Sequence, residues 1–300
     1  MNVLFGKVFG LGNAVMAVPA IKAIAAVHGP IDVLVGSGPD DGGALDVMQE
    51  LRATDRCVRT VYDTRVPDPI SHDVAVMSIP FDGRWRNGTH FHAEKVIDGR
   101  PRPGDPAVVS LDSWELHEAE YQMQNAVELG HSGPMPSSQF SKFGGVVEED
   151  LVYVGLGYKR DAQNFWSKKH WGNDRFVSFV NEVRRLRPKT MFVTTGGNID
   201  LTTMIELGRG AAPIDWKVKN IRQSFRDVAM AGAYFGNDTG MAHVAGSFGR
   251  RCYVMTAFAK SEVKNPPLGA SKLRCERFDE TARDPEAVAA DFVEFAWGDR

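Results

Sequence analysis

The chain has 300 residues, 43% of them hydrophobic and 24% charged, which predicts two globular domains and excludes a disordered or fibrous protein. No run approaches the ~18 apolar residues of a membrane span, and three scattered cysteines, without metal spacing or a disulfide pattern, favour a reducing cytoplasm. The net charge of −3 divides into −9 over residues 1–150 (12 Lys and Arg against 21 Asp and Glu) and +6 over the remainder (23 against 17), so the second half suits a polyphosphate and the first half does not suit a long polyanion.

Apolar runs alternate with amphipathic ones through the first half. The start reads as strand, loop and helix rather than as a signal peptide, because no basic segment precedes the apolar run. Strands alternating with helices imply a parallel sheet with helices on both faces, and residues 82–112 predict a long connection. The predicted strands are Val3–Phe5 with Val8–Phe9, Ile31–Val35 and Val74–Ile79; the helices are Ala14–Val27, Leu45–Leu51 and Ser113–Leu129; Gly10–Asn13 is a tight loop.

The same rhythm restarts after a linker at His131–Glu149, which carries Gly, Pro and Ser without period. Two similar αβ halves point to a ligand cleft between doubly wound domains. The last helix is predicted to begin at Asp284, with Asp as N-cap and Pro in the first turn. The other predicted strands are Leu151–Gly155, Met191–Thr195 and Ala233–Phe235, and the helices are Trp171–Leu186, Thr202–Leu207, Ser224–Ala231 and one from about Met241.

The stretch YFGNDTGMAH, residues 234–243, is the most informative in the chain. A strand runs into a polar turn flanked by glycines, and a helix begins directly after it. The amide groups and positive dipole end of that helix make an anion site, to which Thr239 adds a hydroxyl and Gly240 a close approach to the backbone. His243 lies in the first turn of the helix. Asp238 and Thr239 suit simple helix caps equally well, and the sequence leaves both interpretations open.

A second cluster, FWSKKHW at residues 165–171, follows the first strand of the second half. A lysine in a loop past the carboxyl end of a strand is placed to meet a ligand, and its ammonium can neutralise a diphosphate. We expect this role of Lys169. Lys168 is interpreted as a solvated surface residue and Trp171 as a core anchor.

Other motifs carry weaker signals. The GLGNAV segment at residues 10–15 lacks the third glycine of the dinucleotide fingerprint, which disfavours a nicotinamide cofactor. His90 and His92 with Glu94 suggest metal ligands or a base and its partner, but no third ligand follows at a recognisable spacing, so solvated loop histidines are favoured. The acidic segment Asp112–Glu120 favours a solvated face, although one carboxylate could act as a general base. Neither a G-x-S-x-G nor a Walker A sequence is present.

Three segments resemble the heptosyltransferase-type glycosyltransferases, family 9, of the GT-B fold. Residues 10–24 are similar to that family's opening loop and helix, and Lys169–Trp171 with Arg175 and Phe176 resembles its phosphate-binding segment. The most specific match is GNDTGMAHVA at residues 236–245, which resembles its donor signature. Order and spacing agree over nearly the whole chain, with little similarity at residues 82–150.

The resemblance implies an α/β chain with two Rossmann-like, doubly wound domains facing a central cleft. Residues 1–140 would form the acceptor-side domain, residues 150–283 the donor-binding domain, and residues 284–300 a helix that packs back on the N-terminal domain. The diphosphate, the nucleotide and its ribose would be held without a metal and without a cofactor other than the nucleotide-diphosphate sugar, a co-substrate. The implied donor residues are Lys169, Gly196, Gly197, Asp200, Lys219, Asp238, Thr239, Gly240 and His243, and the acceptor-side loop is Gly10, Gly12 and Asn13.

One position departs from the family. Its proposed base is an Asp where this chain has Asn13, and an amide cannot accept a proton at neutral pH. Either another group deprotonates the acceptor, or Asn13 only positions it, or the protein is a poor catalyst. The candidate catalytic residues are Asn13, His92 and Asp112, with His90 as a further substitute base.

The favoured function is inverting, metal-independent transfer of a hexosyl or heptosyl group from a nucleotide-diphosphate donor to an acceptor hydroxyl in the cytoplasm. The acceptor stays open between a surface glycan, another glycoconjugate or glycolipid, and a small molecule. The acidic first half disfavours a nucleic-acid acceptor without excluding it. The alternatives are a non-catalytic nucleotide-sugar binding protein, which Asn13 motivates, and a nucleotide-sugar epimerase or hydrolase on the same fold.

Overall fold

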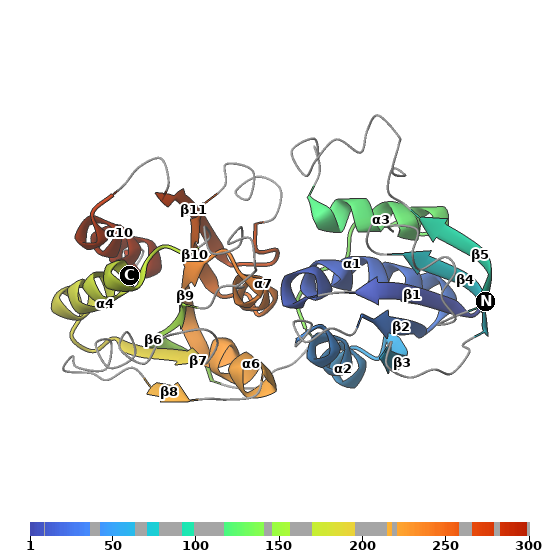
Figure 1. Cartoon of the computed structure of the whole chain (residues 1–300), viewed down its shortest axis with the longest axis horizontal. Helices are drawn as coiled ribbons and strands as arrows, with labels where there is room; N and C mark the ends of the chain where they lie inside the picture. Colours follow the sequence, from blue (N-terminus) through green and yellow to red (C-terminus); the bar gives the residue numbers. More distant parts are fainter. Residues whose placement is uncertain are drawn as a thin grey trace. The chain divides into compact units, whose positions relative to one another are not determined.

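The structure is a computed structural model, and it describes residues 1–8, 10–36, 43–63, 71–77, 92–98, 117–140, 146–156, 170–195, 215–217, 221–257, 266–278 and 283–298. The chain divides into two compact units, unit 1 (Met1–Lys142) and unit 2 (Phe143–Arg300). The division falls inside the segment that its Gly, Pro and Ser content marks as a linker. Each unit is described by itself (Figure 1).

Unit 1 is built on a five-stranded parallel sheet in the order β3-β2-β1-β4-β5. Helix α1 packs against both α2 and α3. The strands are β1 (Val3–Val8), β2 (Ile31–Val35), β3 (Val58–Asp63), β4 (Ser71–Met77) and β5 (His92–Asp98), and the helices are α1 (Leu11–His28), α2 (Ala44–Thr54) and α3 (Glu118–Glu128).

Helix α1 forms the centre of the unit 1 core. Its residues from Ala14 to Ile21 are all buried, and β1 before it pairs with a strand on either side. Among the described helices, α1 alone has the length and apolar composition to cross a membrane, and more than half of it is buried inside the unit. Helix α1 is therefore a core helix of unit 1 in this structure, and β1 precedes it, as predicted.

Unit 2 is built on a six-stranded parallel sheet in the order β11-β10-β9-β6-β7-β8. Figure 1 shows α4 and α10 on one side of this sheet and α6 and α7 on the other. The strands are β6 (Glu148–Gly155), β7 (Met191–Thr195), β8 (Asp215–Lys217), β9 (Ala231–Asn237), β10 (Arg251–Thr256) and β11 (Lys272–Arg277), and the helices are α4 (Asn173–Leu186), α6 (Ile221–Met230), α7 (Gly240–Ser247) and α10 (Pro285–Trp297).

An aromatic core lies between the unit 2 sheet and the α4–α10 pair. The rings of Phe179 on α4 and Phe235 on β9 stack with centroids 3.5 Å apart, and Phe292 of α10 contacts both rings edge-on. Aromatic rings of this size bury the most apolar area per residue, so this cluster is the main source of hydrophobic stabilisation in unit 2.

The last helix starts as predicted, because the Asp284 carboxylate accepts a hydrogen bond from Glu286 N–H at 3.4 Å and Pro285 occupies the first turn. Its apolar face, which includes Val288 and Phe292, packs on α4 and β10. The packing of this helix on the N-terminal domain, which the resemblance implies, stays a prediction.

Several elements differ from those predicted. Residues Leu11–Asn13 form the first turn of α1 rather than a loop, and β5 lies inside the expected connection of residues 82–112. Strands β3 and β11 carry charged residues at intervals and are only partly buried, which hides the apolar run that marks a central strand. Edge strands of this kind are covered on fewer sides and need less apolar sequence.

Both sheets follow one winding scheme. In each unit the first strand lies in the middle, the next two strands extend the sheet one way, and the chain then crosses back to the other side of the first strand. The reversal lies between β1 and β4 in unit 1 and between β6 and β9 in unit 2. Doubly wound proteins bind ligands at the carboxyl ends of the strands at this switch point.

Candidate functional site

The candidate site is at the switch point of unit 2, where β6 and β9 end side by side. Gly155 of β6 pairs with Gly236 of β9, and the chain leaves the sheet at Leu156 and at Asn237 respectively. Because all strands of the sheet are parallel, these two exits and the end of β10 meet at one edge. The predicted donor turn, Asp238–Gly240, therefore lies where a ligand of this fold class is expected.

Two glycines allow an unusually close approach between β6 and β9. A Cβ at Gly155 would collide with the hydroxyl of Tyr234, and a Cβ at Gly236 would lie 2.6 Å from the Gly155 Cα. The space is used by Tyr234, whose hydroxyl donates to the main-chain oxygen of Asn237 at 2.8 Å and lies 3.5 Å from Thr239 Oγ1. The buried hydroxyl of Tyr234 thus fixes the main chain at the start of the turn. Burial raises the pKa of Tyr234, so the hydroxyl stays protonated and remains a donor.

The turn then opens into helix α7. Thr239 is its N-cap in an extended conformation, and the Thr239 side chain makes no capping hydrogen bond. The Ala242 N–H donates to Thr239 O at 3.0 Å, whereas the amides at the very start of a helix have no earlier helical carbonyl as partner. Thr239, Gly240 and Met241 are all partly exposed. The Thr239 hydroxyl is therefore not used as a helix cap in this structure, and anion binding at the turn stays a prediction.

Asp238 and His243, unlike the partly exposed Thr239, have buried side chains. Asp238 is 8% exposed and His243 is 5% exposed. The main-chain N–H of Asp238 donates to Met255 O of β10 at 3.0 Å. A carboxylate offers acceptors only, so an anion at this turn would be bound through Thr239 and the helix amides. His243 lies in the first turn of α7, as the sequence predicts.

Asn237 lies directly before the predicted donor turn and was not among the donor residues expected from the sequence. Its side chain has 0% exposure; Oδ1 accepts from the Trp171 N–H at 3.0 Å and Nδ2 donates to Leu156 O at 3.2 Å. A fully polar residue at the end of a buried strand is the signal that would have found it. Trp171 itself is a buried core anchor, as predicted, with its ring edge-on to Phe176 and Phe235.

Most of the remaining donor residues lie outside the described residues, and their roles stay predictions. The same holds for Asp112, a catalytic candidate, and for His90 and Lys168. The donor residues in this group are Lys169, Gly196, Gly197, Asp200 and Lys219.

Unit 1 places Asn13 at its own switch point. Gly10 has φ +63° directly before α1, which suits glycine, and Asn13 lies partly buried in the first turn of that helix together with Gly12. His92 is the first residue of β5, where it pairs with Ser71 at the amino edge of the sheet. A seven-residue strand spans roughly 20 Å, so the structure does not bring His92 to Asn13, and the loop assignment of His92 was wrong.

The amino edge of unit 1 holds a buried ionic cluster that the sequence did not suggest. Asp32 on β2 accepts from Arg59 Nη2 of β3 at 2.6 Å, and its Oδ2 lies 2.9 Å from His72 Nε2 of β4. Burial opposes the charge of Asp32, but the hydrogen bonds from Arg59 and His72 outweigh it and lower the pKa of the carboxyl. The cluster joins three strands at the edge away from Asn13, which indicates a structural role.

We also searched the described part of the chain for a metal site. No group of three or more His, Cys, Asp or Glu side chains within it is placed to hold a metal ion. His92 and Glu94 both belong to β5, and His90 lies outside the described residues.

Comparison with known proteins finds structural rather than sequence similarity. No family model matches the chain, and no curated protein matches it. The structure is similar to Escherichia coli ADP-heptose LPS heptosyltransferase II (TM-score 0.69, 15% identity, covering 100% of this chain and 99% of that one). It is also similar to E. coli heptosyltransferase WaaC solved with ADP (TM-score 0.74, 14% identity, 99% and 100%) and to a family 9 glycosyltransferase from Veillonella parvula (TM-score 0.67, 12% identity, 100% and 98%).

These similarities extend over the full length of all three proteins, so they concern both units. At such low identities they establish the architecture and leave the chemistry to the site itself. The chain has the two-unit α/β architecture of the heptosyltransferases, the GT-B type that its sequence resemblance implied.

Proposed function

We propose that the protein is a glycosyltransferase that binds a nucleotide-diphosphate sugar at the β9–α7 turn and transfers the sugar to an acceptor hydroxyl. The observation that carries the proposal is the partly exposed start of α7, where the first amides have no earlier helical carbonyl as partner. Its N-cap hydroxyl makes no capping bond, and it lies at the switch point of a doubly wound sheet. The similar WaaC was solved with ADP and with ADP-2-deoxy-2-fluoro heptose, which supports a donor of this chemical class.

The proposed reaction inverts the anomeric carbon. The acceptor oxygen forms a bond to that carbon as the bond to the diphosphate oxygen breaks, and the hydroxyl proton passes to a base. Negative charge develops on the departing diphosphate, where the amides of α7, the Thr239 hydroxyl and the ammonium of Lys169 would stabilise it without a metal. Asn13 would orient the acceptor hydroxyl by hydrogen bonding, because an amide cannot take the proton.

For the base we propose one candidate residue, and for the acceptor only the chemical group that reacts. Asp112 is the remaining candidate base among the three sequence-derived catalytic residues, since His92 starts a strand at the opposite sheet edge from Asn13. Glycan, glycolipid and small-molecule acceptors all present the required hydroxyl. Asn13 also favours a second function, a nucleotide-sugar binding protein without transferase activity, in which the donor would bind but would not react.

A ligand screen tests the donor site. ADP, GDP, UDP, dTDP and CDP are compared by thermal shift and titration calorimetry on the wild type, Thr239→Val, Lys169→Ala and Ser247→Ala. We expect one diphosphate to stabilise the wild type and to bind Thr239→Val about tenfold more weakly, because a hydrogen bond to a charged group contributes roughly 1.5 kcal/mol or more. Ser247→Ala, which removes a buried hydroxyl at the opposite end of α7, is the matched control and should bind as the wild type does.

Two results would contradict the proposal. If none of the five diphosphates binds the wild type, the donor site does not exist and the similarity concerns the fold alone. If Ser247→Ala weakens binding as much as Thr239→Val, the effect is on helix stability rather than on the ligand. Donor binding without release of sugar to any acceptor would favour the non-catalytic binding protein.

A further inference from the structure

We propose that Asn237 is a positioning residue, which fixes the donor turn relative to the ends of two other elements and thereby sets the affinity of the site for diphosphate. This inference rests on the proposed function. Asn237 is the last residue of β9 and directly precedes Asp238, so any movement of its Cα moves the start of α7 with it.

The side chain of Asn237 uses both ends of its amide. The oxygen accepts from the main-chain N–H of Trp171 at 3.0 Å, just before α4, and the nitrogen donates to the main-chain oxygen of Leu156 at 3.2 Å, just after β6. The residue is completely buried, so neither partner can be replaced by bulk water. A primary amide is the side-chain group of this size that supplies one donor and one acceptor in a plane.

Both partners of Asn237 are themselves fixed. The ring of Trp171 packs edge-on against Phe176, with centroids 5.2 Å apart, and against Phe235 at 5.6 Å. Leu156 is buried directly after β6 and belongs to the same core cluster. The amide of Asn237 therefore joins the turn to two rigid points of the unit 2 core.

The main chain of Asn237 is held independently, because its carbonyl accepts the hydroxyl of Tyr234 at 2.8 Å. Three hydrogen bonds thus define one residue from three directions, immediately before the donors that would receive the diphosphate. Preorganised donors lose effect when they are misplaced by a fraction of an ångström to 1 Å. Asn237 would act through the turn and would not touch the ligand.

The variant Asn237→Asp separates this role from simple packing, because the two side chains have the same shape. An ionised carboxylate keeps the acceptor for Trp171 but turns an acceptor toward Leu156 O, whereas the protonated acid regains a donor. Binding of the nucleoside diphosphate that stabilises the wild type most, among the five screened, is measured by calorimetry at pH 7.5 and pH 5.0. The variant's Kd is divided by the wild-type Kd at each pH, which cancels titration of the nucleotide.

We expect the Kd ratio of Asn237→Asp to be tenfold or more at pH 7.5 and to fall toward one at pH 5.0. Asn237→Ser, which lacks the amide and has no titratable group, should show a raised ratio that does not change with pH. Tyr253→Phe is the control: it removes a buried hydroxyl that bonds Glu276 from the adjacent strand β10, and its ratio should stay within twofold of one at both pH values.

A Kd ratio within twofold of one for both Asn237 variants at pH 7.5 would overturn the positioning role while leaving the donor site intact. A ratio for Asn237→Asp that is equal at the two pH values would also overturn it, provided circular dichroism shows a folded protein. Absence of any diphosphate binding to the wild type is the separate result that removes the proposed function and this inference together.

Discussion

At Gly155 the missing side chain is what allows Tyr234 to reach the donor turn. The Tyr234 hydroxyl occupies the space where a Cβ at Gly155 would lie, and it bonds the Asn237 carbonyl. One glycine thus links the end of β6 to the geometry of a turn that follows β9. The GNDTG sequence shows the turn but contains neither Gly155 nor Tyr234, so a motif alone describes only part of the site.

Asp32 is a buried charged residue in the sheet of unit 1. The carboxylate is buried at 3% exposure with Arg59 and His72 as partners, and its pKa is lowered below the ordinary value. A carboxyl whose folded pKa lies below its unfolded pKa, about 3.9, contributes stability above that pH. This contribution is lost as the pH falls through the folded-state pKa.

We therefore predict that Asp32→Asn lowers the free energy of unfolding by about 1–3 kcal/mol at pH 7, because the buried ring of His72 and the largely exposed guanidinium of Arg59 lose their carboxylate partner. The difference from the wild type should shrink as the pH falls below about 4. Urea denaturation between pH 7 and pH 3 measures it, with the exposed Asp174→Asn as control. A difference that stays constant down to pH 3 would contradict the account.

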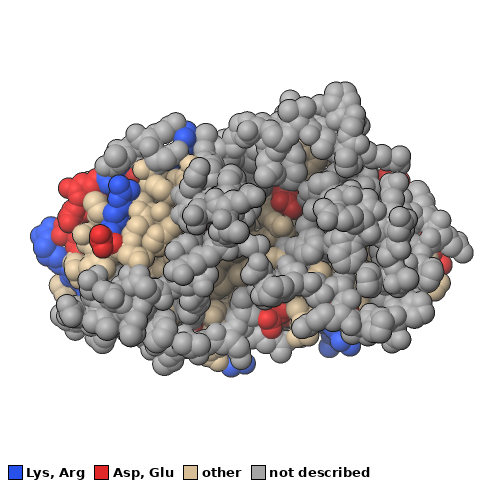
Figure 2. All heavy atoms as spheres, viewed as in Figure 1, with Lys and Arg blue, Asp and Glu red and all other residues tan. Residues whose placement is uncertain are grey.

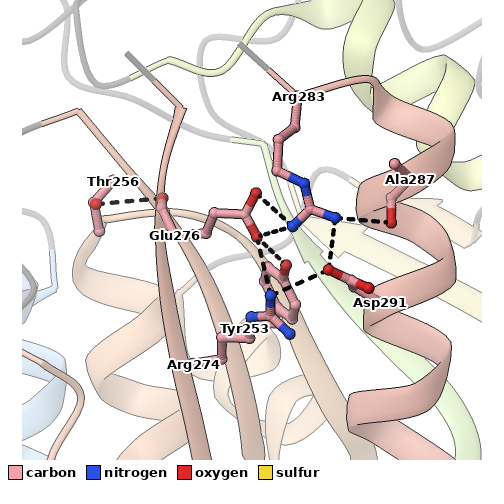
Figure 3. A network of polar contacts seen from close by, with 7 residues as sticks. All are labelled: Tyr253, Thr256, Arg274, Glu276, Arg283, Ala287 and Asp291. Atoms are coloured by element: carbon pink, nitrogen blue, oxygen red, sulfur yellow. Dashed lines mark hydrogen bonds and ion pairs between the residues drawn. The ribbon is translucent and has the colours of Figure 1, made fainter. Parts of the chain in front are cut away.

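At the scale of elements, strand β11 and helix α10 depend on a shared polar network (Figure 3). Glu276 of β11 is buried and accepts from the Tyr253 hydroxyl of β10 and from Arg283 Nη1 at 3.1 Å. Arg283 also donates to Asp291 of α10 at 2.6 Å, and Arg274 of β11 donates to the same carboxylate at 3.1 Å. The network joins an edge strand with little buried apolar surface to the last helix.

Removing the centre of this network should loosen that edge. We predict that Glu276→Ala destabilises the protein by about 1–3 kcal/mol, because the Tyr253 hydroxyl and Arg283 lose a buried acceptor. Glu294→Ala changes an exposed carboxylate on α10 and should stay within about 0.5 kcal/mol of the wild type. The midpoints of guanidinium denaturation compare the two, and equal losses would show that Glu276 is no more than a surface charge.

The sequence predicted central elements better than edge elements. Strands β2 and β7 have the predicted bounds, and α4 and α7 begin within two residues of the predicted positions. These elements combine a clear apolar period with a glycine or a cap at one end. Strands β3 and β11 were not predicted because charged residues break their alternation. The partners of these residues lie in other elements, as Asp32 does for Arg59 and Tyr253 does for Glu276.

The residues of the candidate site were likewise predictable only where they follow from local sequence. The turn Asp238–Gly240 and His243 follow from local sequence, since strand, turn and helix are contiguous. Asn237 required knowledge of Leu156 and Trp171, which are brought to it only by the crossover from β6 to β9. His92 was assigned to the wrong kind of position because its strand lacks a strong apolar run and its sheet edge is a property of the topology.

At the scale of the whole molecule, the two units repeat one strand order but differ in charge. With the boundary at Lys142, unit 1 has 12 basic and 18 acidic residues, and unit 2 has 23 basic and 20 acidic. On the end of unit 2 that carries α4 and α10, described charges of both signs lie side by side (Figure 2), as in the Arg185–Glu182 pair. The described charges at that end of unit 2 are therefore of mixed sign on the face shown.

Whether the donor binds at the start of α7 is tested by amide hydrogen exchange of the full chain, with and without the tightest-binding of the five nucleoside diphosphates. We predict that the ligand slows exchange in peptides covering residues 237–243, at the β9–α7 turn, and leaves the β10–β11 peptides unchanged. We also predict that Thr239→Val reduces this protection while Ser247→Ala does not. A ligand that binds without protecting the turn, or that protects only other peptides, would contradict the assignment of the donor site to the start of α7.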